Sequence, residues 1–144
     1  MNKTGGEIEQ DFYTIVKNSP IAGAIKGRVY TDGSRPINAK TEDAVIAFIT
    51  GLDAQTQTGA VHLNIYVPAI DNGGGILVKD GKRCKELEKI ADQAIRALKP
   101  SEYRIYLLNT IKTTKVEETD STAEGINQYC INVKIGFDLI TFLS

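Results

Sequence analysis

The chain has 144 residues, and its 17 Lys and Arg against 18 Asp and Glu give a formal net charge of −1 with the single histidine neutral. Proteins whose main task is to grip nucleic acid normally carry a basic surplus, because counterion release from phosphates supplies much of the affinity. We therefore expect no direct sequence-specific binding of nucleic acid. A hydrophobic content of 42% and a charged content of 24% are typical of one globular domain, here residues 1–144.

The same composition predicts a protein without a membrane partner. The longest apolar runs, such as Ile105–Leu108, are far shorter than the roughly 18 residues of a membrane span. The first residues lead into acidic side chains rather than an apolar segment, so we expect no secretory signal and a cytoplasmic protein. Cys84 and Cys130 lie outside any C-x-x-C pair and are expected to be reduced and half-buried.

The first third of the chain predicts two helical segments and a strand. Ile8, Phe12, Ile15 and Val16 recur at helical spacing, which favours a surface helix over residues 7–17. Ser19-Pro20 can then open a short helical turn over 21–25, because proline suits the first helical position. Residues 28–30 are predicted to form a short strand that ends in the turn formers of residues 31–36.

Two longer strands follow. Within residues 43–51, the run 44–49 is apolar at every position, which predicts a strand covered on both faces. Residues 61–67 alternate between apolar and polar side chains and end at Pro68, which is typical of a strand buried on one face. The strands on either side of the polar segment 54–59 are long enough to form an extended hairpin.

The second half of the chain predicts one helix and two closing strands. Cys84, Leu87, Ala91, Ala94 and Leu98 repeat at helical spacing, so a helix is expected over 82–98, before Pro100. A strand is predicted to run from Tyr103 to about Thr113, and a second over 129–139, where alternation is the most regular. Flexible loops are expected at about 69–81, with a small strand pair inside it, and at about 114–125.

The predicted fold is an α+β single domain. Its order is α-β-β-β-α-β-β, with a mixed or mainly antiparallel sheet of about five strands packed against two main helices. No internal repeat divides the chain.

Several candidate sites fail on their residue patterns. Gly73-Gly74-Gly75 lacks the spacing and the G-K-[ST] ending of a phosphate-binding loop, so a loop without a phosphate is favoured. A zinc site would require His62, Cys84 and Cys130 to converge from distant positions. We predict no metal, no cofactor and no catalytic residue, and we interpret His62 as a surface histidine on the polar side of its strand.

A nuclease of the restriction-endonuclease type shares the first six elements of this order. Its metal chemistry needs an acid on the second strand and an acid-x-Lys on the third. Asp43 can supply the first acid, but residues 61–66 contain neither a carboxylate nor a lysine. The sequence therefore predicts that the protein is not an enzyme of this class.

The whole chain resembles the small tail-completion proteins of long-tailed bacteriophages and prophages, which include the tail terminator and the minor capsid or head-tail joining proteins. An amphipathic N-terminal helix is followed by Gly27-Arg28-Val29-Tyr30, a turn containing Pro36 and the apolar strand 44–49. Strand 61–67, helix 82–98 and two closing strands continue the same order. The resemblance covers nearly all of the chain and rests on element order.

The resemblance implies a subunit that assembles with itself as a ring, typically a hexamer, and meets the tail-tube and head-connector proteins in the virion tail. Its loops then reach neighbouring subunits, so the loops at 69–81 and 114–125 are the interface candidates. Opposite charges on the two loops suit head-to-tail contacts around a ring. The candidate interface residues are Lys79, Lys82, Arg83, Glu117, Glu118 and Asp120.

A different interpretation is a cytoplasmic α+β domain that dimerises or binds a small ligand. The pocket of such a domain is expected between the second main helix and the sheet.

Overall fold

The computed structural model describes residues 3–52, 57–116 and 127–140. Three helices lie at Gly5–Lys17 (α1), Pro20–Ala24 (α2) and Gly81–Ala97 (α3). The strands are Val29–Thr31 (β1), Ala44–Leu52 (β2), Thr58–Pro68 (β3), Ile70–Asp71 (β4), Leu77–Val78 (β5), Tyr103–Leu107 (β6), Lys112–Lys115 (β7) and Gln128–Leu139 (β8).

The strands form one mixed sheet and one small hairpin, which confirms the predicted α+β domain. The main sheet has six strands in the order β1-β2-β3-β8-β6, and β7 also pairs with β8. β1 runs parallel to β2, and the other pairs are antiparallel. β4 and β5 pair with each other in a separate two-stranded hairpin, which is the small strand pair predicted in the loop before α3.

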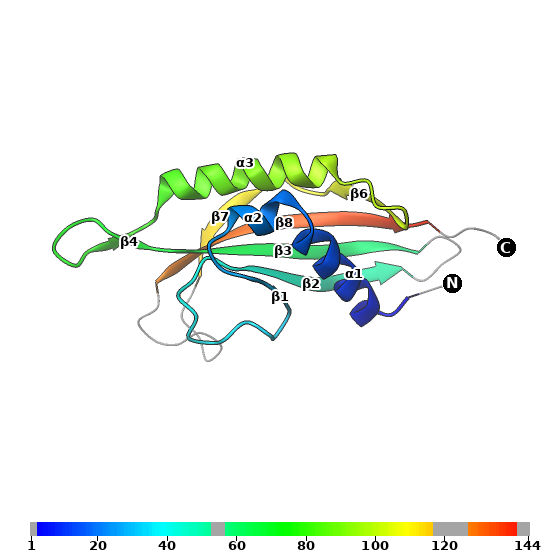
Figure 1. The fold of residues 1–144 in the computed structure, drawn as a ribbon, viewed down its shortest axis with the longest axis horizontal. Coiled ribbons are helices and arrows are strands. Elements are labelled where there is room, and N and C mark those ends of the chain that lie inside the picture. Colours follow the sequence, from blue (N-terminus) through cyan, green and yellow to red (C-terminus); the bar gives the residue numbers. More distant parts are fainter. Residues whose placement is uncertain (1–2, 53–56, 117–126, 141–144) are drawn as a thin grey trace.

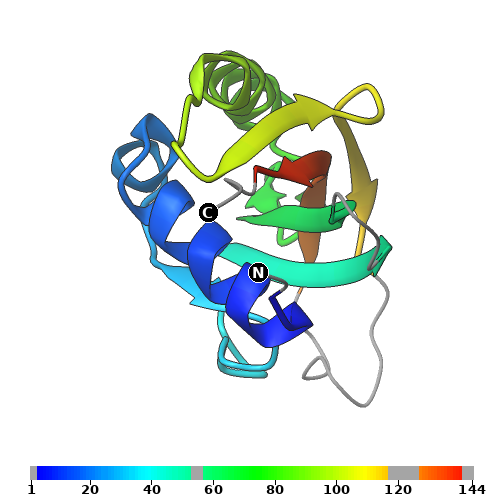
Figure 2. The same ribbon diagram turned by 90° about the vertical axis from the view of Figure 1, so that its right-hand side faces the viewer.

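The three helices of the described residues lie on one face of the sheet, and no described helix lies on the opposite face (Figures 1 and 2). Alternate residues of β3 and β8 point into the helical layer and are buried. Phe12 of α1 anchors this core, because its ring lies 5.1 Å from that of Tyr103 and 5.7 Å from that of Phe137. The fully buried large side chains are Phe12, Phe137, Ile8, Ile21, Ile46, Leu63, Ile65, Leu87, Ile95, Ile131, Ile135 and Val16.

The predicted helices are confirmed, with boundaries shifted by one or two residues. Thr4 and Glu7 form a reciprocal capping box that starts α1. Ser19 caps α2 ahead of Pro20. The Asp80 carboxylate accepts a hydrogen bond from the Arg83 N–H and starts α3.

The strand predicted from Tyr103 to about Thr113 is wrong in one respect: it is broken into β6 and β7. Both pieces pair with the same side of β8, but Leu107 is opposite Ile135 while Lys112 is opposite Asn132. The chain therefore advances by five residues from Leu107 to Lys112 while β8 advances by only three, from Ile135 to Asn132. The extra residues between β6 and β7 do not pair with β8, so the predicted single strand becomes two, and the sheet has six strands.

The prediction that β2 is covered on both faces holds only for its first half. Ala44, Val45 and Ile46 are buried, whereas Ile49 and Leu52 are 38% and 65% exposed. Near the start of β2, the loop of residues 32–43 reaches the helix-free face, where the Arg35 guanidinium lies 4.2 Å from the centre of the Tyr66 ring. At the other end of β2, the described residues leave that face uncovered.

The antiparallel hairpin predicted from β2 and β3 is confirmed by their register from Ala44–Ile65 to Leu52–Thr58. Residues 53–56 of its connection, and residues 117–126 of the predicted second loop, lie outside the described residues. No helix in the described part of the chain is both long enough and apolar enough to cross a membrane.

Candidate assembly surfaces

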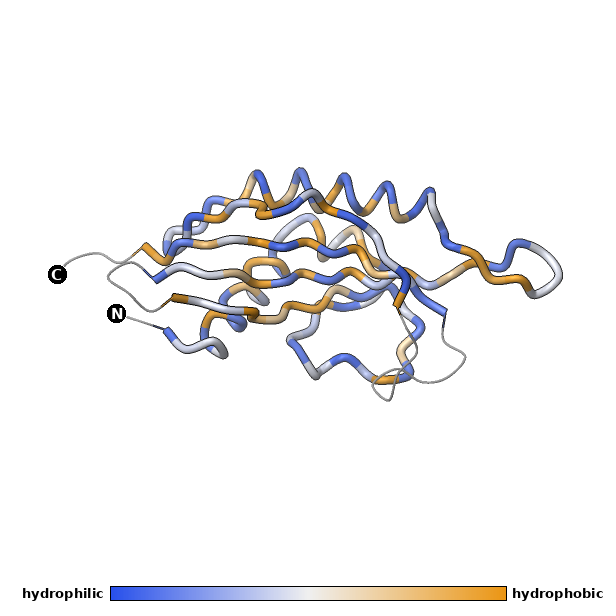
Figure 3. The backbone as a smooth tube through the Cα atoms, turned by 180° about the vertical axis from the view of Figure 1, so that it is seen from behind, coloured by the Kyte–Doolittle hydropathy of each residue, from blue (hydrophilic) through white to orange (hydrophobic). Residues whose placement is uncertain are grey.

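The β4–β5 hairpin projects beyond the main sheet at one end of the molecule (Figures 1 and 3). The described part of the chain leaves its large apolar residues uncovered: Ile70, Ile76 and Leu77 are 45%, 65% and 47% exposed. Their backbone is nevertheless organised, because Ile70 pairs with Val78 and Asp71 pairs with Leu77. These three side chains, called the hairpin residues below, form the clearest exposed apolar feature at this end.

The turn of the hairpin explains the run of three glycines. Gly73, Gly74 and Gly75 all have positive φ angles, of 103°, 65° and 82°, which side chains with a Cβ disfavour. The Asp71 Oδ1 atom accepts hydrogen bonds from the N–H groups of Gly73 and Gly75, at 2.8 and 3.2 Å. Because a carboxylate of the chain itself takes these N–H groups, the turn is not arranged as a phosphate cradle.

The predicted basic surface divides into two kinds of residue. Lys79 and Lys82 are exposed at the base of the hairpin and the start of α3. Arg83 instead points into the protein, where its Nε and Nη2 atoms donate to the Glu42 carboxylate at 2.9 and 2.6 Å. Its Nη2 also donates to the Ala24 carbonyl at 2.6 Å. The Arg83 guanidinium therefore pairs with Glu42 of the same chain. The assignment of Lys79 and Lys82 to an interface stays a prediction.

The acidic half of the predicted interface, Glu117, Glu118 and Asp120, lies outside the described residues. Its proximity to Lys79 and Lys82, in the same chain or in a neighbour, therefore stays a prediction.

Two consecutive buried acids hold the loop before β2 in place. Glu42 is 5% exposed and binds Arg83, while Asp43 is 1% exposed. Asp43 accepts hydrogen bonds from the Thr41 hydroxyl at 2.6 Å, the Arg28 N–H at 2.8 Å and Arg35 Nε at 3.0 Å. Burial acts to raise the pKa of Asp43, but these hydrogen bonds outweigh it and hold the pKa below its usual range.

These anchoring roles were missed at the level of sequence. Asp43, considered there as a possible metal ligand, serves instead to fix residues 28, 35 and 41 around it. Gly27 offered no signal at that level, because only the folded chain shows that a Cβ at this position would lie 2.0 Å from Asp43 Oδ1. Glu42 offered none, since its partner Arg83 lies 41 residues further along the chain.

The helix-free face of the sheet, called the open face below, is built from the other set of alternating residues. The register places Ala47, His62 and Lys134 in one row, and Val45, Asn64 and Asn132 in the next. Among the described residues, Asn64 Oδ1 is a buried oxygen without a hydrogen-bond partner. Burial and the neighbouring Lys134 lower the pKa of His62, which keeps its ring neutral at pH 7.

A less polar row crosses the open face at the end opposite the hairpin. Thr50, Ala60, Gly136 and Tyr106 lie side by side on β2, β3, β8 and β6. A Cβ at Gly136 would lie 2.3 Å from Tyr106 Cε2, so the Tyr106 ring packs directly against this glycine. The exposed apolar residues that the register places on this part of the open face, called the open-face row below, are Leu52 and Tyr106.

The three residues considered for zinc do not converge. Cys84 belongs to α3 and is buried in the core between the helices and the sheet. His62 lies on the open face, and Cys130 shares that face because it pairs with Tyr66. Both cysteines are free and buried, more deeply than predicted. Within the described ranges, no group of three His, Cys, Asp or Glu side chains is placed to hold a metal.

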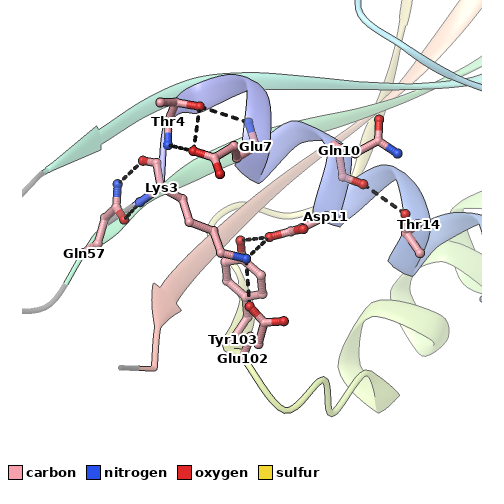
Figure 4. Close-up of polar contacts among 9 residues, drawn as sticks. All are labelled: Lys3, Thr4, Glu7, Gln10, Asp11, Thr14, Gln57, Glu102 and Tyr103. Carbon is pink, nitrogen blue, oxygen red and sulfur yellow. Dashed lines mark hydrogen bonds and ion pairs between the residues drawn. The ribbon is translucent and has the colours of Figure 1, made fainter. Parts of the chain in front are cut away.

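A polar cluster ties the N-terminal residues to the end of the sheet (Figure 4). Lys3 Nζ bridges the carboxylates of Asp11 and Glu102, at 2.5 and 2.7 Å, and the Tyr103 hydroxyl donates to Asp11 at 2.6 Å. The backbone N–H and carbonyl of Lys3 both bond to the side-chain amide of Gln57. Every member has a partner within the cluster, so we interpret it as structural.

The space between α3 and the sheet, where the ligand-binding alternative expected a pocket, is filled by core side chains. Cys84, Leu87 and Ile95 of α3 are each 1% exposed. A hollow of about 200 Å³ lies elsewhere, between α1 and the segment 100–103, and one of about 230 Å³ lies beside Leu107–Ile111. Both are smaller than the roughly 300–1,000 Å³ of common ligand pockets.

In comparisons with known proteins, no protein-family model matches the chain, and no curated protein matches it significantly.

Proposed function

We propose that this chain is a structural, non-enzymatic subunit of a phage or prophage tail, of the tail-terminator kind. In this role it assembles as a ring at the end of the tail tube and joins the tail to the head. The observation that carries the proposal is the β4–β5 hairpin, which holds Ile70, Ile76 and Leu77 exposed beyond the main sheet. Exposed apolar side chains that gather on one projecting element are typical of a contact between proteins.

The kind of assembly comes from the resemblance in element order to tail-completion proteins. That resemblance implies self-association in a ring, typically of six copies, and contact with tail-tube and head-connector proteins. The buried pairs of Glu42 with Arg83 and of Asp43 with Arg35 support such a role. They fix the loop before β2 and the start of α3, so the hairpin leaves the body from a firmly held base.

Light scattering over a range of concentrations tests the proposal, with negative-stain electron microscopy to detect rings. The decisive variant is Ile76→Asp, and the matched control is Ile37→Asp, because Ile37 is 60% exposed but lies outside the hairpin. We expect the wild type and the control to assemble and Ile76→Asp to stay monomeric. A wild type that is monomeric at every concentration, and does not bind a tail-tube protein, contradicts the proposal.

The charged part of the interface has its own test. Reversing Lys79 and Lys82 to glutamate is expected to weaken assembly at low salt, whereas reversing Lys85 and Lys89 of α3 is the control with the same change in charge. Arg83 is left intact, because its partner is Glu42 inside the protein. Unchanged assembly of the Lys79 and Lys82 variant removes the charge pairing and leaves the hairpin contact in place.

A further inference from the structure

The segment before β2 forms a loop with little buried surface. Residues 32–41, called the strap below, belong to no helix or strand. Eight of these ten residues are exposed, and the exceptions are Arg35 and Ala39. Segments with few buried contacts open locally at a lower free energy than the whole domain needs to unfold. The position of the strap therefore depends on a small number of specific contacts.

Arg35 makes the contacts that join the strap to the open face. Its Nη2 atom donates to Gln128 Oε1 of β8 at 3.2 Å, and its guanidinium lies 4.2 Å from the centre of the Tyr66 ring of β3. Among the hydrogen bonds of the described residues, no other strap residue bonds to either of these strands. The Asp32 N–H instead bonds to Glu9 of α1 at 3.3 Å, in an exposed position.

The Arg35 side chain is itself firmly placed. Asp43 Oδ2 accepts a hydrogen bond from Arg35 Nε at 3.0 Å, and the Thr41 carbonyl accepts one from Nη2 at 3.0 Å. Both ends of the strap are anchored independently of Arg35. Thr31 pairs with β2 at one end, and the Asp43 carbonyl accepts from the Tyr66 N–H at 2.7 Å at the other. The segment between these anchors can therefore move without breaking the ladders of the sheet.

The Arg35 guanidinium joins the two side chains that flank Cys130 on the open face. Tyr66 lies opposite Cys130 on β3, and Gln128 precedes Cys130 by two residues on the same side of β8. Cys130 is only 6% exposed, although no described helix covers this face. Burial raises the pKa of Cys130 to about 12, and the nearby Arg35 charge acts in the opposite direction. The strap therefore contributes to the cover over this thiol.

We propose that the strap opens and closes as a unit on a folded domain, with Arg35 as the latch that keeps it closed over Tyr66 and Cys130. Opening breaks the hydrogen bond to Gln128 and the stacking on the ring, and it leaves both anchors of the strap intact. The inference goes beyond the proposed function, because the movement takes place within one chain and involves neither the hairpin residues nor the open-face row. The chain itself thus covers or uncovers one end of the open face.

Thiol labelling of the full chain tests the latch, with Cys84 as an internal reference. Cys84 lies in the core between α3 and the sheet, so it becomes accessible when the whole domain unfolds. The decisive variant is Arg35→Ala. The matched control is Lys40→Ala, which removes an exposed cation from the same strap. Mass spectrometry after labelling with iodoacetamide identifies which thiol has reacted.

In native buffer, Cys130 of Arg35→Ala is expected to react at least about tenfold faster than Cys130 of the wild type, because a charge-assisted hydrogen bond no longer holds the strap closed. Cys84 is expected to stay protected, and Lys40→Ala to behave like the wild type. Below the unfolding transition, labelling of Cys130 in Arg35→Ala should depend only weakly on urea, since local opening exposes little surface. Labelling of Cys84 should rise steeply with urea.

A second variant separates opening of the strap from loss of the fold. Arg35→Ala leaves the buried Asp43 carboxylate without its cation, which destabilises the whole domain. Arg35→Met combined with Asp43→Asn removes that unpaired charge and keeps a long side chain at position 35. This double variant is also expected to expose Cys130 and not Cys84.

Three results overturn the inference. Cys130 that stays as protected in both Arg35 variants as in the wild type shows that the strap does not open. Reaction of Cys130 and Cys84 together, with the same dependence on urea, shows that the whole domain unfolds instead. Exposure of Cys130 in Lys40→Ala as strong as in Arg35→Ala shows that Arg35 is not the latch. Ring assembly is tested separately by light scattering, so a failure of the ring proposal is distinguishable from a failure of the latch.

Discussion

The covered face and the open face of the sheet come from the same strands, yet the described residues cover only one of them. On the covered face, Val133, Ile135 and Phe137 of β8 are fully buried beneath the helices. On the open face, their neighbours Asn132, Lys134 and Asp138 remain partly exposed. The difference teaches that the buried core that stabilises the domain lies on one face, whereas the other face keeps exposed surface.

Removing one aromatic side chain from each face is expected to give the largest difference in stability between two variants. Phe137→Ala empties a fully buried position in the aromatic cluster, so we expect a loss of about 4 kcal/mol in the free energy of unfolding. Tyr106→Ala, at a position that is 38% exposed, is expected to cost about 1 kcal/mol or less. Urea denaturation measures the two effects. Equal losses of stability in the two variants would contradict the assignment of the stabilising core to the covered face.

The ion pairs of α3 sharpen the comparison further. Arg83→Ala leaves the Glu42 carboxylate buried without its bidentate partner, and the expected cost is about 3 kcal/mol. Arg96→Ala removes an exposed pair with Asp92 and is expected to cost about 0.5 kcal/mol or less. Thermal unfolding of both variants measures the difference. A similar small cost at both positions would show that Arg83 is not an anchor.

Acid is expected to release the loop that Asp43 holds. The pKa of Asp43 is lowered in the folded protein, so its carboxylate contributes its full stability above the ordinary pKa of 3.8 and loses it as the pH falls further. The stability advantage of the wild type over Asp43→Asn should therefore shrink below pH 3.8. Urea denaturation at pH 6 and at several values below 4 measures this, and a constant gap contradicts the role assigned to Asp43.

The smallest expected effect concerns the two thiols. Burial raises the pKa of Cys130 to about 12, and it also raises the pKa of Cys84, so little thiolate is present at pH 8. We expect both thiols to react with a chromogenic thiol reagent only after denaturation. Rapid reaction of the native protein would show that the open face near Cys130 opens more readily than the described contacts imply.

The sequence was sufficient to predict the elements whose two sides face different surroundings. β3 and β8 alternate strictly because one side meets the helices and the other does not, so their positions were predictable. The break between β6 and β7 was not, since the alternation runs past Leu108 and the break depends on how many residues of β8 lie opposite. The exposed half of β2 was missed because apolar residues there do not reveal which face lacks a covering layer.

The candidate surfaces were predictable only in outline. The loop that contains the hairpin was identified from its glycines, but the inward position of Arg83 depends on Glu42, a contact between distant parts of the chain. The row of Thr50, Ala60, Gly136 and Tyr106 on the open face combines residues from four strands, and its composition follows from the register of the sheet rather than from any local motif.

If the proposed assembly takes place through the hairpin, its glycine turn also affects how fast copies of the chain associate. With Gly73 and Gly75 held by the Asp71 carboxylate, the hairpin is already shaped before a partner arrives. Little conformational entropy then remains to be lost on contact, so preorganisation rather than added area strengthens the interaction. Replacing Asp71 with alanine should accordingly slow association more than it destabilises the fold, because the defect lies in the readiness of the hairpin and not in the core.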